Sequence, residues 1–199
     1  MPCSPGRRPG RRCFGSAGRF PDSAHSTTQR AGRGRGANAR THAAALIATG
    51  ADRPAAGPKL LATRSRTYPD TEEVLGWNIG TDGFRIVLSV EIATVVEKYM
   101  GEDVRNFLGD YGLTTEDIST WVLHAAGPKV IDAVENVLDL PADALDLTRK
   151  SLRDNGNLSS VSVLDILQDT MTDPPPPGSI GLMIAMGPGF SAELVLLGW

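Results

Sequence analysis

The feature that most constrains this chain is an abrupt change in composition near residue 43. Residues 1–42 contain nine arginines, no lysine and one acid, Asp22, so they carry a net charge of +8. Since the whole chain carries −3, the residues that follow carry −11. The first segment has almost no large aliphatic side chains, and it cannot bury enough apolar surface to offset the entropy lost on ordering. We therefore expect residues 1–42 to be disordered and residues 43–199 to form the folded domain.

Three interpretations of residues 1–42 stay open. An arginine-rich, acid-poor segment is typical of a targeting peptide or of an arm that binds nucleic acid. The segment lacks interleaved aromatic side chains and helical amphipathicity, so we expect no nucleic-acid partner. A GC-rich gene read in a wrong frame or from a wrong start gives a sequence of the same composition, and this third interpretation is favoured.

The cysteines and the hydropathy pattern exclude further classes. Cys3 and Cys13 are too few for a disulfide scaffold, and their context is not that of a nucleophile. No run of about twenty apolar residues is present, as a membrane-spanning helix would require. We expect a cytoplasmic protein without a membrane span, a metal ion or a resident cofactor.

After residue 43, the apolar residues follow the periods of strands and helices in turn. Predicted strands occupy residues 43–52, 59–66, 84–89, 120–123, 180–185 and 192–197, the first two as a hairpin. Predicted helices occupy residues 92–100, 104–111, 128–138, 142–153 and 161–171. Residues 68–77 are expected to be an irregular connection, and Ser159 or Ser160 to cap the last helix. This order predicts a layered α/β fold with helices on the faces of a sheet.

Two polar side chains lie where predicted elements meet. His124 follows a buried strand, and Asn157 lies in a small-residue turn about thirty positions later. A His and an Asn that converge can hold a carbonyl oxygen between two donors, as acyl transfer and decarboxylation require. The alternatives are a structural histidine and an asparagine that shapes a turn before a helix. Without further information, Asn155 could supply this second donor as well as Asn157.

Three segments in this order resemble the C-terminal half of the bacterial type III polyketide synthases, the chalcone and stilbene synthase family. His124–Pro128 resembles the family's His-Pro-Gly-Gly-Pro turn, although two alanines replace its first Pro and first Gly. Gly156–Ser160 resembles Gly-Asn-Met-Ser-Ser. Ala185–Gly189 resembles the Gly-Phe-Gly-Pro-Gly loop, with Ala and Met in place of the first Gly and the Phe.

The resemblance implies a thiolase-like layered α-β-α fold, with one complete half and the last hairpin of the other. It implies that His124 hydrogen-bonds the thioester carbonyl of malonyl-CoA and that the amide NH₂ of Asn157 is the second donor. The residues implied to line the substrate pocket are Ser159, Met186, Gly187, Pro188 and Gly189. The implied reaction is decarboxylative condensation of malonyl-CoA onto an acyl-CoA starter, by an enzyme that is a homodimer at full length.

The family's nucleophilic Cys and the basic residues that grip the CoA phosphates cannot be located in this sequence. Extension needs a thiolate that holds the growing chain, so the chain resembles a truncated synthase. One alternative is a β-ketoacyl-ACP synthase III, which normally has His-Gln-Ala-Asn where His124–Gly127 reads His-Ala-Ala-Gly. Another is a non-catalytic remnant or a subunit that pairs with a Cys-bearing partner. Without its other half, the chain is expected to expose the apolar faces of Phe84–Ser89 and Thr120–Leu123.

Overall fold

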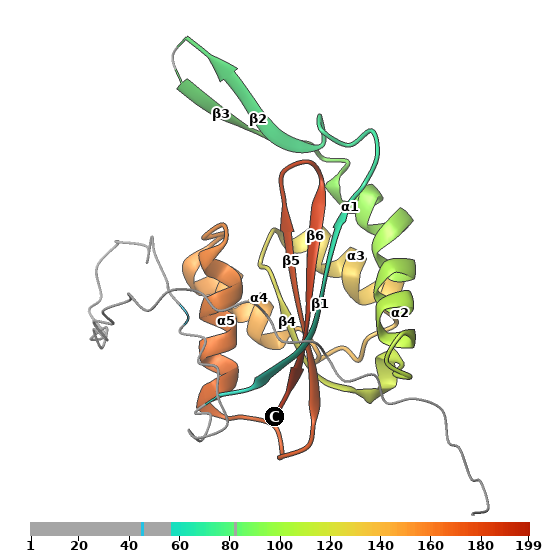
Figure 1. Ribbon diagram of the computed structural model, residues 1–199. Coiled ribbons are helices and arrows are strands. Elements are labelled where there is room, and N and C mark those ends of the chain that lie inside the picture. Colours follow the sequence, from blue (N-terminus) through green and yellow to red (C-terminus); the bar gives the residue numbers. More distant parts are fainter. Residues whose placement is uncertain (1–44, 46–56, 82) are drawn as a thin grey trace, which may run out of the picture. The chain divides into compact units, whose positions relative to one another are not determined.

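Four strands from distant parts of the chain form the main sheet (Figure 1). The computed structural model describes residue 45, residues 57–81 and residues 83–199. The sheet has the order β1-β6-β5-β4, in which β4 and β5 are parallel and the other neighbours antiparallel. Its strands are β1 (Lys59–Thr67), β4 (Ile118–Leu123), β5 (Ile180–Gly187) and β6 (Ser191–Gly198). The predictions for residues 1–42 and for a strand at 43–52 concern residues that are not described, with the single exception of Ala45.

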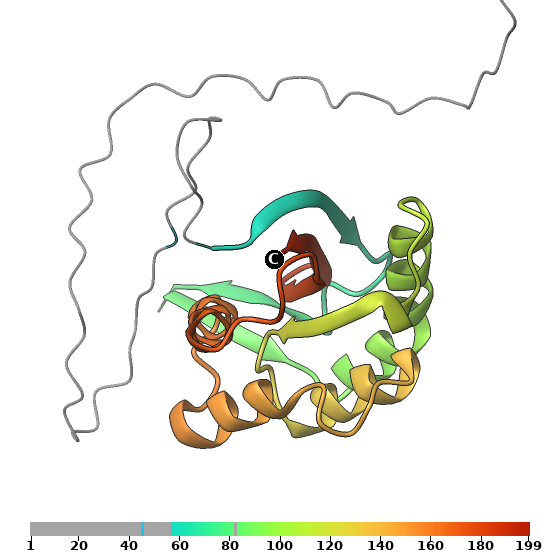
Figure 2. The same ribbon diagram turned by 90° about the horizontal axis from the view of Figure 1, so that it is seen from below.

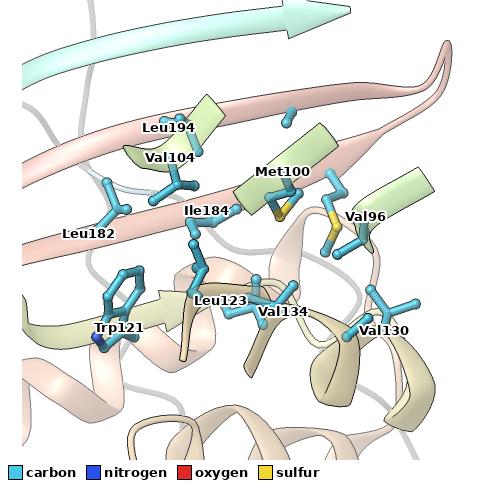
Figure 3. Close-up of a cluster of buried hydrophobic side chains, with 14 of the residues drawn as sticks. Val96, Met100, Val104, Trp121, Leu123, Val130, Val134, Leu182, Ile184 and Leu194 are labelled. Carbon is cyan, nitrogen blue, oxygen red and sulfur yellow. The ribbon is translucent and has the colours of Figure 1, made fainter. Parts of the chain in front are cut away.

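One face of this sheet carries the larger buried cluster. Because successive side chains of a strand point to opposite faces, Trp121 and Leu123 of β4 face the same way. They pack with Leu182, Ile184 and other buried side chains into one cluster (Figure 3). The helical elements that contribute to it include α1 (Ile92–Val95), the π-helical turn η1 (Val96–Met100), α2 (Gly101–Gly109) and α3 (Pro128–Leu138). The expectation that Thr120–Leu123 exposes an apolar face is wrong, since Trp121, Val122 and Leu123 are all buried here.

The other face of the sheet carries a smaller cluster. Val122 of β4 packs there with Val163 and Ile166 of α5 (Val161–Thr172), and Met183 of β5 lies against them. Figure 2, in which the molecule is seen from below, shows α5 and α2 on opposite sides of the sheet. The connecting helix α4 (Asp146–Asn155) begins four residues later than the sequence predicts, because Ala142–Leu145 forms turns instead.

The segment predicted as two helices, 92–100 and 104–111, is one continuous helical run. The backbone stays in the right-handed helical region from α1 through η1 into α2, so the predicted break is wrong. Gly101 lies at that point because a β-carbon there would come within 3.1 Å of the Val137 carbonyl oxygen in α3. This glycine therefore permits close helix packing and does not end a helix.

Residues 75–88 form a separate two-stranded sheet. β2 (Leu75–Gly80) pairs with β3 (Gly83–Leu88), so the prediction of an irregular connection is wrong from Leu75 onward. The sequence did not indicate β2, because Gly76, Asn78 and Gly80 have low strand propensity. Ile79 and Phe84 lie opposite each other on one face of this hairpin and are 74% and 71% exposed. The expected exposure of an apolar face in Phe84–Ser89 is confirmed.

Candidate active site

His124 lies where two parallel strands end. It follows β4 directly, and its backbone N–H donates to the carbonyl of Ile184 in β5 at 2.9 Å. From α4, the Thr148 hydroxyl donates to the carbonyl of Leu123 at 3.2 Å, which fixes the last residue of the strand. Carboxyl ends of parallel strands commonly present side chains to a ligand crevice. The side chain of His124 is buried, and its residue is 8% exposed.

Both ring nitrogens of His124 face oxygen atoms. Nδ1 is 3.3 Å from the carbonyl oxygen of Met186, and Nε2 is 3.2 Å from Oδ1 of Asn157. The structure thus brings together the two residues that the sequence singles out, one after β4 and the other between α4 and α5.

The orientation of the Asn157 amide is fixed by its backbone neighbours. Oδ1 accepts a hydrogen bond from the N–H of Ser159 at 2.8 Å, and Nδ2 donates to the carbonyl of Ala126 at 3.0 Å. A flipped amide would place oxygen against oxygen at Ala126 and N–H against N–H at Ser159. The amide therefore turns its oxygen, and not its NH₂, toward His124.

This arrangement gives the imidazole two acceptors. A neutral imidazole carries one N–H and can donate to only one of Met186 and Asn157. Unless the ring carries two protons, one of its nitrogens faces an oxygen with no hydrogen between them.

The predicted pocket residues of the β5–β6 turn differ in burial and in the part of each residue that faces His124. Met186 turns its side chain into the core, 7% exposed, and only its carbonyl faces His124. Gly187 ends β5, Pro188 is exposed, and Gly189 has a φ of +123°, which a side chain would strain. The N–H of Gly189 donates to the carbonyl of Leu75 at 2.8 Å.

A threonine that the sequence did not single out holds this turn. The hydroxyl of Thr71 donates to the carbonyl of Tyr68 at 2.7 Å and accepts from the N–H of Phe190 at 2.9 Å. The Tyr68 N–H in turn donates to the Phe190 carbonyl at 3.0 Å. The available signal was the turn-forming segment Pro69-Asp70-Thr71, whose link to residue 190 depends on tertiary packing.

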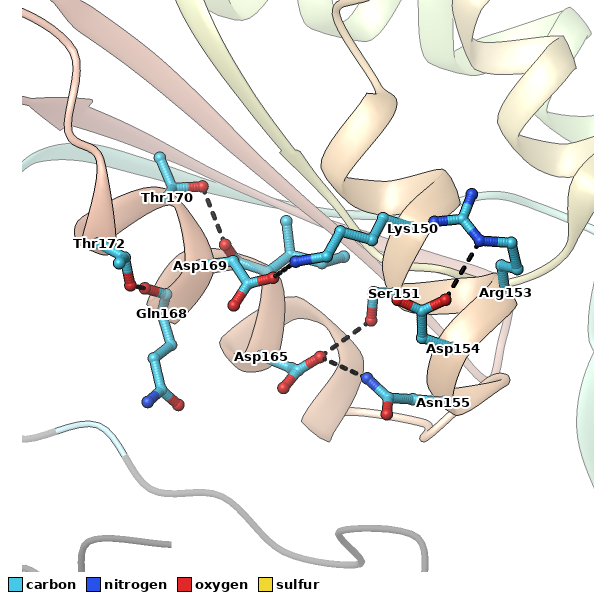
Figure 4. A network of polar contacts seen from close by, with 11 residues as sticks. Lys150, Ser151, Arg153, Asp154, Asn155, Asp165, Gln168, Asp169, Thr170 and Thr172 are labelled. Carbon is cyan, nitrogen blue, oxygen red and sulfur yellow. Dashed lines mark hydrogen bonds and ion pairs between the residues drawn. The ribbon is translucent and has the colours of Figure 1, made fainter. Parts of the chain in front are cut away.

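The loop around Asn157 also differs from the prediction. Neither Ser159 nor Ser160 caps α5 through its side chain, and Ser159 has a left-handed φ of +57°. The hydroxyl of Ser162 instead accepts from the N–H of Leu158 at 2.8 Å. Asn155 is distinguished from Asn157, because its amide donates to Asp165 at 3.0 Å (Figure 4).

Tyr68 is a buried titratable group beside the turn. Its ring stacks on Tyr99 and Phe190, with centroids 4.9 and 5.8 Å away. Burial raises the pKa of its hydroxyl, and the adjacent Asp103 carboxylate raises the pKa further. Within the described residues, neither the Tyr68 hydroxyl nor Oδ2 of Asp103 has a hydrogen-bond partner.

Other features of the described residues lie away from His124. A cavity of about 480 Å³ lies at the opposite end of β4, and its lining includes Glu116, Trp121 and Asp143. In the part of the chain that the structure describes, no group of three His, Cys, Asp or Glu side chains is placed to hold a metal ion. None of the described helices is long and apolar enough to cross a membrane.

Comparisons of the sequence with known proteins give one family. The family model for chalcone and stilbene synthases, C-terminal domain, matches residues 59–198. The 1,3,6,8-tetrahydroxynaphthalene synthase of Streptomyces peucetius subsp. caesius is 52% identical over 161 residues, which cover 79% of this chain and 43% of that protein. The putative chalcone synthase of Bacillus subtilis is 36% identical over 143 residues, which cover 71% of this chain and 39% of that protein. The chain thus spans about two fifths of the length of these relatives.

Solved structures agree with the sequence comparisons. The tetrahydroxynaphthalene synthase of Streptomyces coelicolor A3(2) matches with a TM-score of 0.70 at 27% identity, over 74% of this chain and 42% of its own. PKS-I of the brown alga Ectocarpus siliculosus matches in fold, with a TM-score of 0.68 at 23% identity, over 76% of this chain and 42% of its own. The predicted thiolase-like α/β fold is confirmed, and the family match replaces the β-ketoacyl-ACP synthase III alternative. The chain belongs to the chalcone and stilbene synthases, the type III polyketide synthases, and corresponds to their C-terminal domain.

Proposed function

We propose that this chain supplies the His-Asn half of the active site of a synthase that condenses malonyl-CoA onto an acyl-CoA starter. The observation that carries the proposal is the 3.2 Å contact between Nε2 of His124 and Oδ1 of Asn157 at the carboxyl end of β4. The carbonyl of Met186 faces the His124 ring and the carbonyl of Ala126 accepts from the Asn157 amide, so backbone atoms hold both groups beside the place of the substrate oxygen.

The step assigned to this pair is decarboxylation. The bond between the carboxylate carbon and C2 of the malonyl group breaks, CO₂ leaves, and the electron pair stays on C2 as a thioester enolate. The enolate oxygen takes the place of Oδ1 of Asn157 as acceptor for the Nε2–H of His124. The second hydrogen on Nδ2 of Asn157, which Ala126 does not use, becomes the other donor. Protonation of C2 then yields acetyl-CoA.

Extension of a polyketide requires a further group. The C2 carbanion must attack an acyl group held as a thioester on a cysteine, whose thiolate is then released. Cys3 and Cys13 precede the described residues, and the family match begins at residue 59. We therefore assign the cysteine and the CoA-phosphate contacts to an amino-terminal half of the kind that the longer relatives contain. The complete synthase is proposed to be a cytoplasmic homodimer.

The pocket assignment is also part of this proposal. Ser159 follows Asn157 by two residues, and the turn Gly187-Pro188-Gly189 follows Met186, whose carbonyl faces His124. We assign both segments to the wall around the growing product. For Met186, the role is assigned to its carbonyl, which faces His124, because its side chain is in the core. The names of the relatives, tetrahydroxynaphthalene synthase among them, support an aromatic product.

Malonyl-CoA turnover tests the proposal. The full chain is incubated with malonyl-CoA, and acetyl-CoA is measured by chromatography, first alone and then with the amino-terminal half of the Streptomyces peucetius relative. We expect slow decarboxylation by the chain alone, and polyketide only from the mixture when an acyl-CoA starter is added. His124→Ala and Asn157→Ala are expected to abolish both activities, whereas Asn106→Ala, an exposed asparagine of α2, should leave them unchanged. Polyketide from the chain alone, or activity indifferent to both substitutions, would contradict the assignment.

A further inference from the structure

We propose that Asp165 of α5 is a positioning residue that sets the Asn157 amide against His124. This inference rests on the proposed function for its catalytic meaning, but its structural content stands on the contacts alone. Asp165 was not among the residues that the sequence singled out. It lies on α5, whereas His124 follows β4 and Asn157 lies in the loop between α4 and α5, so its effect must pass through that loop.

Asp165 ties the end of α4 to α5. Its Oδ2 atom accepts hydrogen bonds from the Ser151 hydroxyl and the Asn155 amide, both at 3.0 Å (Figure 4). Ser151 and Asn155 are four residues apart, so they present their side chains on the same face of α4. Asp165 is 9% exposed, and a polar group at that depth is costly to bury unless such donors face it. The last turn of α4 is therefore locked to α5.

Asn155 is two residues from Asn157, and the chain between them has little freedom. Gly156 closes α4, with its N–H bonded to the Leu152 carbonyl at 2.9 Å and a φ of +75°. On the far side of Asn157, the Ser162 hydroxyl accepts from the N–H of Leu158. Asn157 is thus held between two α5 side chains, Asp165 through Asn155 and Ser162 through Leu158. A shift at the Asn155 end must rotate Asn157 relative to the His124 ring.

The chain contains a matched control for this contact. Asp169, one turn further along α5, pairs with Lys150 of α4 at 2.8 Å. The hydrogen bond to Asp169 raises the pKa of Lys150. Asp169 therefore also links α5 to α4 through a carboxylate, but it does not contact Asn155. A general loosening of the two helices should affect both positions, whereas a positioning role belongs to Asp165 alone.

The test measures the NMR signals of the His124 ring. The chain has three histidines, so the full-length protein with His25→Gln and His42→Gln reports His124 alone in imidazole ¹⁵N spectra. In this background Asp165→Asn keeps the size of the side chain but replaces an acceptor by an NH₂ that faces another donor. Asn155→Ala removes one exposed donor and carries little risk to folding. Asp169→Asn is the control, and thermal unfolding confirms that each variant is folded.

We expect the His124 ring signals to move in Asp165→Asn and in Asn155→Ala but not in Asp169→Asn. Malonyl-CoA decarboxylation should fall about 10-fold to 100-fold in kcat in the first two variants, because a misplaced donor weakens the transition state. Ring signals that stay in place in both, or that move equally in the Asp169 control, would overturn the positioning role. If Asp165→Asn does not fold, the ring signals of Asn155→Ala alone test the positioning role. If the parent chain shows no decarboxylation, the proposed function fails, while the ring signals still test Asp165.

Discussion

The hydroxyl of Thr71 accepts a hydrogen bond from the backbone N–H of Phe190, 2.9 Å away, although the two residues are 119 positions apart. Thr71 is 4% exposed, and its hydroxyl also reaches the Tyr68 carbonyl. The turn after β5 is thereby attached to the segment after β1. Since the Met186 carbonyl precedes this turn and faces His124, the attachment fixes one of the two acceptors of the ring.

Thr71→Val should destabilise the fold by about 1–3 kcal/mol, because the buried N–H of Phe190 loses its acceptor. Thr71→Ser keeps the hydroxyl and should lose clearly less. Urea unfolding of the three proteins measures the difference. Equal stability of the valine variant and the parent would show that water replaces the hydroxyl.

Tyr68→Phe should change the pH dependence of stability. The folded state holds the phenolic proton more tightly than the unfolded chain, in which the pKa of tyrosine is about 10. The stabilising effect is complete below that pH and is lost as the pH rises toward the folded-state value. Urea unfolding between pH 8 and pH 11.5 should therefore show a steeper decline for the parent than for Tyr68→Phe. Parallel curves would mean that the hydroxyl reaches solvent or a partner that holds its anion.

Gly101→Ala should be destabilising, whereas Gly109→Ala in the same helix should not. A β-carbon at Gly101 would lie 3.1 Å from the Val137 carbonyl oxygen and 3.3 Å from Cβ of Val137, and so push α2 from α3. A β-carbon at Gly109 meets nothing within 4 Å among the described residues, and alanine is favoured over glycine in helices by up to about 1 kcal/mol. Thermal unfolding of both variants tests the opposite signs. Stabilisation by both would show that α2 and α3 separate easily.

Ile79→Lys and Phe84→Glu, made together, should reduce self-association of the chain. The two residues are paired on the exposed apolar face of the β2–β3 hairpin, and such a face favours contact with other apolar surfaces. Asn78→Lys adds a charge to the opposite face of the same strand and serves as control. Light scattering after size-exclusion chromatography gives the oligomeric state. A parent chain that is already monomeric at high concentration would contradict this prediction.

The periodicity of apolar residues predicted the strands that are covered by other elements along most of their length. It failed where contacts with distant parts of the chain determine the local structure. Most side chains of β4, β5 and β6 are buried or half-buried, and their apolar runs alone indicated strands. β2 was missed because its glycines mask the alternation of Leu75, Trp77 and Ile79. The predicted break between 92–100 and 104–111 falls at Gly101, whose close contact with α3 could not be predicted from this segment alone. His124 and Asn157 were found through their motifs, but the orientation of the Asn157 amide depends on Ala126 and Ser159 and could not be predicted.

The position of β6 in the sheet has a consequence for synthesis of the protein. β6 lies between β1 and β5, with Lys59 opposite Gly198, and β1 has no other neighbour in the described sheet. A ribosome that has produced β1 must therefore add more than 120 further residues before that strand can pair, because its partner begins at Ser191. Contacts so distant in sequence form late. We expect nascent chains to leave the ribosome with β1 unpaired, and a chain that stops before Ser191 to be a substrate for chaperones and proteases.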